Sequence, residues 1–161
     1  MTALTPSQGV REATDKPAAA HVLAGLLALL AVGAIQGGVA MVANPTGPLG
    51  MSLDYLERSP VDDYFWPGVF LLSVAVASIL AVVGIEFEWQ WNWAEPIERA
   101  IGHRWPWLAS LAVGGLLLGF EIIELFVVPF HPVMHPLLIA VAVVIIALSL
   151  APSTRDYLKS R

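Results

Sequence analysis

Two glutamates, Glu121 and Glu124, interrupt one of the long apolar segments of this chain. Three positions apart in a helix, their side chains share one face. Counted from Pro106 at 1.5 Å per residue, Glu121 lies about 22 Å along that helix, in the outer third of a bilayer. A carboxylate in hydrocarbon costs about 2.5–3.5 kcal/mol on insertion scales. We therefore expect Glu121 to face other helices and Glu124 to lie near the outer headgroups, as a candidate intramembrane polar site.

Three further side chains are candidate partners for this site. Gln36 lies at a similar depth in the first apolar segment, and His131 and His135 flank the proline-rich turn beyond Glu124. Carboxylates with imidazoles can bind a divalent metal, with His131 and His135 as the candidate ligands. They can also transfer a proton. A third interpretation, favoured by the sequence alone, is structural: Glu121 is protonated or hydrogen-bonded, and the other groups contact water.

The rest of the sequence offers no chemistry of a familiar enzyme. It contains no cysteine, which excludes disulfides and thiolate ligands. It also lacks a nucleophile elbow, a phosphate loop, a zincin motif and the kinase motifs. The net charge of −5 leaves no basic stripe for nucleic acid. We therefore predict no cofactor and no catalytic residue, and we favour a non-enzymatic role while leaving enzymatic activity open.

The elements that must position these residues are membrane helices. Apolar residues make up 57% of the 161 residues and charged residues only 13%, against about a quarter charged in a soluble domain. The apolar residues form four blocks of roughly the length that spans a bilayer. The predicted fold is an all-α transmembrane four-helix bundle within residues 19–151, with helices over about 19–43, 67–85, 106–128 and 133–151.

The segments outside these blocks are predicted to be short and polar. Residues 1–18 are predicted to form a disordered cytoplasmic tail, and residues 152–161 are predicted to form a second cytoplasmic tail. In the first external loop, the stretch from Ser52 to Glu57 is typical of a short amphipathic helix that starts at a serine cap. The dipeptide Ser59-Pro60 then ends it.

Basic residues and tryptophans predict the orientation. Of the eight Lys and Arg residues, only Arg58 falls in a predicted outer loop. The seven on the predicted inner side are Arg11, Lys16, Arg99, Arg104, Arg155, Lys159 and Arg161. Five of the six tryptophans also cluster around the inner loop, and Trp66 marks the outer edge of the second block. The positive-inside rule then predicts a multi-pass protein of the cell membrane with both termini in the cytoplasm.

Two pairs of glycines have the spacing of close helix contacts. Gly33 and Gly37 form one small-xxx-small pattern, and Gly115 and Gly119 form another. Such patterns let neighbouring helices approach closely. We therefore predict helix packing at these four glycines. The predicted partners are the lipid bilayer and either other membrane proteins or further copies of the chain.

Residues 37–68 carry a resemblance to known proteins. Gly37-Gly38, Asn44-Pro45-Thr46-Gly47-Pro48, Ser59-Pro60, Asp63-Tyr64 and Pro67-Gly68 are part of the pattern. The stretch resembles small bacterial integral membrane proteins with four helices, and the general plan is similar to that of DoxX-like proteins in hydropathy. The first resemblance implies the architecture and carries no activity and no site residues.

These observations leave two functional hypotheses. The first is a small multi-pass membrane protein that acts as a scaffold, an accessory subunit or a homo-oligomer, because catalytic motifs are absent. The second is a small transporter or a proton- or redox-linked membrane protein that uses the intramembrane acid Glu121.

Overall fold

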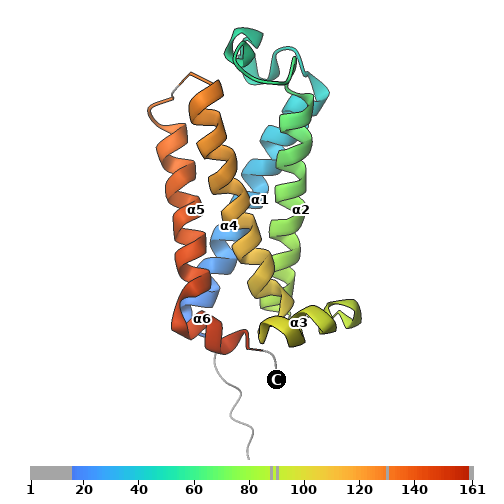
Figure 1. The fold of residues 1–161 in the computed structure, drawn as a ribbon, viewed down its shortest axis with the longest axis vertical. Helices are drawn as coiled ribbons and strands as arrows, with labels where there is room; N and C mark the ends of the chain where they lie inside the picture. Colours follow the sequence, from blue (N-terminus) through green and yellow to red (C-terminus); the bar gives the residue numbers. More distant parts are fainter. Residues whose placement is uncertain (1–15, 88, 90, 130, 160–161) are drawn as a thin grey trace, which may run out of the picture.

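The computed structural model describes residues 16–87, 89, 91–129 and 131–159, and helices make up most of this part of the chain (Figure 1). The all-α prediction is confirmed for these residues, which contain no strand. The helices are α1 (Ala18–Ala43), α2 (Phe65–Glu86), α3 (Glu95–Ile101), α4 (Trp105–Val127), α5 (Met134–Leu150) and α6 (Pro152–Tyr157).

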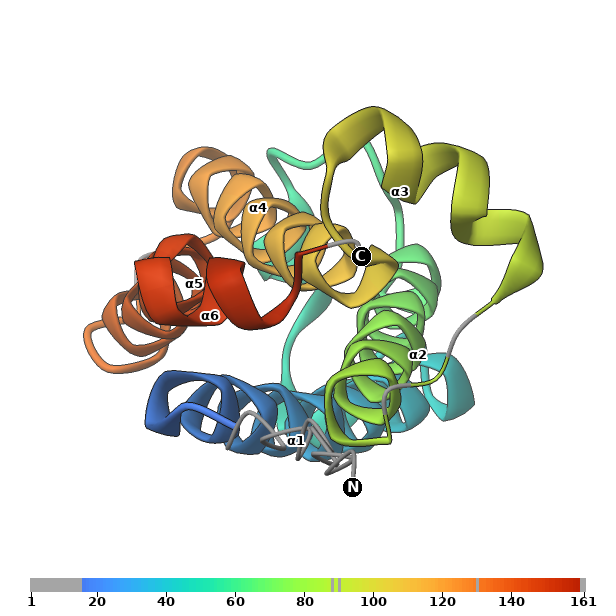
Figure 2. The ribbon, with the colours of Figure 1, turned by 90° about the horizontal axis from the view of Figure 1, so that it is seen from below.

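Among the described helices, α1, α2 and α4 are long and apolar enough to span a membrane. The apolar helix α5 has 17 residues, or about 26 Å at 1.5 Å per residue, against about 30 Å of hydrocarbon. The four lie side by side along the long axis of the molecule (Figures 1 and 2). Contacts join α1 with α2, α2 with α4, α4 with α5, and α5 with α1.

Small residues allow α1 and α2 to approach closely. Six of the seven buried residues of α1 follow one another at spacings of four and three, so that they form one stripe along the helix. This stripe consists of Ala20, Ala24, Leu27, Ala31, Ala34 and Gly38. Near the C-terminal end of α1, a Cβ on Gly38 would stand 2.9 Å from the backbone oxygen of Gly68. The two backbones are therefore in near contact where α1 crosses α2.

Three of the four predicted packing glycines need correction. A Cβ on Gly33, Gly115 or Gly119 would meet no described neighbouring helix within 4 Å, whereas on Gly37 it would stand 3.3 Å from Leu71 of α2, as predicted for a helix contact. The glycines with still closer helix contacts are Gly38, Gly68, Gly84 and Gly114. Gly38 and Gly114 are each one position from a predicted glycine. One position rotates a helical side chain by about 100°, so the glycine spacing alone did not identify the contact face.

The first loop contains 3₁₀ turns where an amphipathic helix was predicted. The turn Leu53–Leu56 follows Ser52, whose hydroxyl accepts a hydrogen bond from the backbone amide of Asp54 at 3.2 Å. The serine cap is therefore present, but only four residues follow it in helical geometry. So short a segment gains too few hydrogen bonds to sustain an α-helix.

The C-terminal segment is folded against the helices, although a tail was predicted for residues 152–161. Leu158 is fully buried in the core, and its carbonyl accepts a hydrogen bond from the backbone amide of Arg104 at 2.7 Å. Helix α6 lies across the same end of the molecule as α3 (Figure 2). At that end Trp105 stacks on Trp91 with ring centroids 4.9 Å apart. The predicted N-terminal tail lies outside the described residues, except for residues 16–18.

Gly38→Leu should destabilise the protein, because the new side chain would meet Gly68 and Leu72. Overpacking of this kind typically costs about 1–3 kcal/mol. The matched control is Gly25→Leu on the same helix, where a Cβ meets open space. Thermal unfolding in detergent, followed by circular dichroism, should show a lower midpoint for Gly38→Leu only. Equal midpoints for the two variants would contradict the close approach of α1 and α2.

Candidate functional site

The site lies between α4 and α5, and the antiparallel register of these two helices creates it. Contacts across the pair recur every seven residues on both helices, which is close to two helical turns. They join Trp107 with Ser149, Gly114 with Ala142, and Glu121 with His135. The first is a hydrogen bond of 2.9 Å from the indole Nε1 to the Ser149 carbonyl. The register that aligns these two pairs also places a carboxylate opposite an imidazole.

Glu121 and His135 form a buried pair. Nδ1 of His135 lies 3.1 Å from Oε2 of Glu121, and the side chains are 6% and 1% exposed. An ionised carboxylate can only accept, so Nδ1 donates when Glu121 is charged. Glu124 completes the group, with Oε2 at 3.9 Å from the same nitrogen and a side chain that is 26% exposed. The group therefore extends from the closed interior to a partly open position one turn along α4.

The charge of this group must be balanced. With both carboxylates ionised and a neutral imidazole, three closely packed groups would carry two negative charges. Removing uncompensated charges from water costs several kcal/mol for each ion. Two protons or one divalent cation would remove the charge. The ligand atoms of Glu121, Glu124 and His135 lie within 4.8 Å of one another, and such a mixed oxygen and nitrogen set suits zinc or another first-row metal.

Two residues of the predicted site lie elsewhere. His131 is exposed, and its Nδ1 accepts a hydrogen bond from the backbone amide of Met134 at 3.2 Å. It precedes α5 and does not belong to the group of ligand atoms that Glu121, Glu124 and His135 form. Gln36 is exposed on α1. Ala34 and Gly38 face the interior, and this register turns Gln36 outward and away from Glu121.

Tyr64 is a neighbour of the site that sequence reasoning missed. Its ring is buried, and its hydroxyl donates a hydrogen bond to the carbonyl of Ser52 at 2.8 Å. Burial raises the pKa of Tyr64, and Tyr55 and the carboxylate of Glu124 raise it further. The Tyr64 hydroxyl thus holds the first loop in place by a hydrogen bond, and the phenol lies close enough to Glu124 for the two groups to interact electrostatically. The only sequence signal for Tyr64 was its position directly before the start of a helix, and many residues without a functional role occupy such positions.

The Glu121–His135 pair should show strong energetic coupling. Glu121→Leu and His135→Leu each leave a polar group buried without this partner, at a cost of about 1–3 kcal/mol. The double variant leaves neither group and should be close to neutral. Thermal midpoints of the chain and the three variants in detergent would complete the cycle. Additive losses would show that the two side chains act independently.

The chain thus brings together an acid and a base that lie 14 positions apart, inside a pair of apolar helices. Neither a family model, nor a curated protein, nor a solved structure matches the chain. The geometry of Glu121, His135 and Glu124, together with the apolar helices around them, therefore supplies the functional inference.

Proposed function

We propose that this chain is a multi-pass integral membrane protein that exchanges protons through an intramembrane site of Glu121, His135 and Glu124. In this proposal α1, α2, α4 and α5 cross the bilayer, and both termini lie in the cytoplasm. Three of these helices are long and apolar enough to span a membrane. The distribution of basic residues supports the orientation, because seven of eight fall on one predicted side.

The position of α5 supports a fourth crossing. It runs alongside α4 and ends where α6 begins, at the end of the molecule where α3 also lies (Figure 1). Its length of about 26 Å is slightly less than the hydrocarbon thickness. A small mismatch of this kind is accommodated by local thinning of the bilayer at a modest cost. The polar segment after α5 would then reach the cytoplasmic surface.

The observation that carries the proton-exchange proposal is the burial of Glu121 against His135. The 3.1 Å distance between Nδ1 and Oε2 allows direct proton transfer between the two groups. Glu124 is more exposed and stands close to the same nitrogen, so it offers a path for the proton to the outer surface. Acid and base side chains inside membrane helices characteristically mark proton pathways.

A second candidate function is self-association through α1. Gln36 is exposed on this apolar helix, one turn from Gly33, which faces open space. An amide in hydrocarbon gains by hydrogen bonding to another helix, and a glycine permits the close approach that this requires. This surface supports the scaffold or homo-oligomer hypothesis and does not involve Glu121.

The topology can be tested directly because the chain has no native cysteine. Single cysteines at Arg58, Arg99 and Ser153 would each stand at an exposed position. In intact cells, a membrane-impermeant maleimide should label Arg58→Cys alone, and all three should react after the cells are opened. Labelling of Ser153→Cys in intact cells would mean that α5 does not cross the bilayer.

Glu121→Gln should abolish proton exchange, because it keeps the shape of the side chain and removes the titratable group. The measurement uses purified protein in liposomes that contain a pH-sensitive dye, with a potassium diffusion potential to drive protons. We expect the flux to fall by about a hundredfold or more. Glu57→Gln, which removes an exposed loop carboxylate, is the control and should leave the flux unchanged.

Two outcomes would overturn proton exchange. If Glu121→Gln conducts as the unaltered chain does, or neither conducts, the oligomeric scaffold becomes the better assignment. If elemental analysis finds one divalent metal per chain that is lost in Glu121→Gln, a metal balances the charge of the site. His135→Gln provides a second variant if Glu121→Gln fails to fold, as judged by its thermal midpoint.

A further inference from the structure

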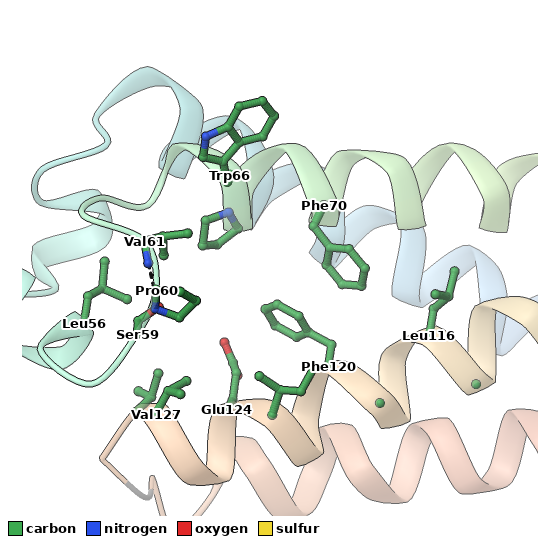
Figure 3. Close-up of a pocket in the computed structure, with 15 residues that line it drawn as sticks. Leu56, Ser59, Pro60, Val61, Trp66, Phe70, Leu116, Phe120, Glu124 and Val127 are labelled. Carbon is green, nitrogen blue, oxygen red and sulfur yellow. Dashed lines mark hydrogen bonds between the residues drawn. The ribbon is translucent and has the colours of Figure 1, made fainter.

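An apolar groove of about 470 Å³ lies between α2 and α4, beside the carboxylate site (Figure 3). Pockets of this size are typical of those that hold small organic ligands. The first loop closes one end of the groove through Leu56 and Pro60. Ser59 and Glu124 supply polar side-chain atoms to its lining, which is otherwise almost entirely apolar.

The groove exists in part because Gly115 and Gly119 have no side chains to fill it. Both line it, and no described atom lies within 4 Å of where a Cβ would stand at either residue. In the same lining, Phe70 of α2 stacks on Phe120 of α4 with ring centroids 4.6 Å apart (Figure 3). The two aromatic rings hold the helices together while the glycines leave space above α4. The glycine pair that makes no helix contact thus has a different structural role.

The groove has the dimensions and surroundings of a site for a lipid tail. From Gly115 to Val128 the lining of α4 extends over about 20 Å at 1.5 Å per residue. This exceeds half of the roughly 30 Å hydrocarbon layer. Both walls belong to helices apolar enough to span a membrane. An inserted groove therefore opens to hydrocarbon, and a single chain is the ligand that fits it.

Local charge and the cost of desolvation restrict the head of such a ligand. The Glu124 carboxylate points into the groove from α4 (Figure 3). A second hollow nearby is lined by Asp54 and Glu57 together with Arg58, so the acids outnumber the basic residue. An anionic head would be repelled here. A hydroxyl donates a hydrogen bond to Glu124 and costs much less to desolvate than an ammonium group.

We propose that this groove binds a single-chain amphiphile with a hydroxyl head. Its chain lies along Gly115 and Gly119, and its hydroxyl donates to Glu124. The inference goes beyond proton exchange. It depends on the proposed insertion of α2 and α4 into the bilayer and not on titration of Glu121. A ligand placed in this way would have its head beside the group that also holds His135.

Trp66 provides a probe of this site because it lines the groove and is 65% exposed. Bromine atoms on a bound chain quench indole fluorescence at short range. We would titrate dibromostearyl alcohol into the purified chain in detergent and subtract the signal of a Trp66→Phe variant. The Trp66 emission should fall saturably with the alcohol. The corresponding dibromostearic acid should bind at least about tenfold more weakly, which is about 1.4 kcal/mol.

Gly119→Leu tests the location, because its side chain would fill the groove without a clash at Cβ. Saturable quenching should be lost in Gly119→Leu and kept in Gly25→Leu, the same change at an exposed position of α1. Unchanged quenching in Gly119→Leu would overturn the groove as the binding site. Equal binding of alcohol and acid would overturn the assignment of the head. Both readouts are independent of proton flux, so failure here leaves that proposal standing, and the reverse also holds.

Discussion

A carboxylate that is 1% exposed within an apolar helix pair needs a polar partner, and Glu121 finds it in His135. This requirement constrains the half of the structure that contains the turn between α4 and α5. The turn between α4 and α5 must return the chain in a register that sets position 135 opposite position 121. The same register brings Trp107 to the Ser149 carbonyl at the other end of the pair. Polar contacts thus tie α4 to α5 at both ends, with the glycine contact at Gly114 between them.

Glycine has two opposite roles in this chain. At Gly38, Gly68 and Gly114 the missing side chain allows a neighbouring helix to come close. At Gly115 and Gly119 the missing side chain leaves a groove that none of the described helices fills. The neighbouring residues Gly114 and Gly115 therefore have different roles: the first packs against α5, and the second leaves space for the groove. Successive residues of a helix point about 100° apart, so the two glycines face different directions. The groove and the tight α4–α5 contact lie on different faces of one helix.

The fold was more predictable than the site. Apolar blocks and prolines located the helical segments, because an apolar run bounded by helix-breaking residues has few other structures available. The site was predicted in part: Glu121, Glu124 and His135 were among the candidates, and the structure brings them together. Gln36 and His131 were also candidates and lie elsewhere. The sequence predicted a depth similar to that of the site for both, but depth does not fix the direction in which a side chain points.

The sequence by itself predicted that this chain is helical, that it contains four apolar blocks of about bilayer length, and that Glu121 would be costly without a partner. These properties follow from local composition. Only the tertiary structure decided which imidazole meets the carboxylate, which glycines touch a neighbour, and that Leu158 closes the core. Each of these depends on the rotation and register of packed helices. Rotation and register are set by side-chain contacts across the whole molecule, and no short stretch of sequence contains them.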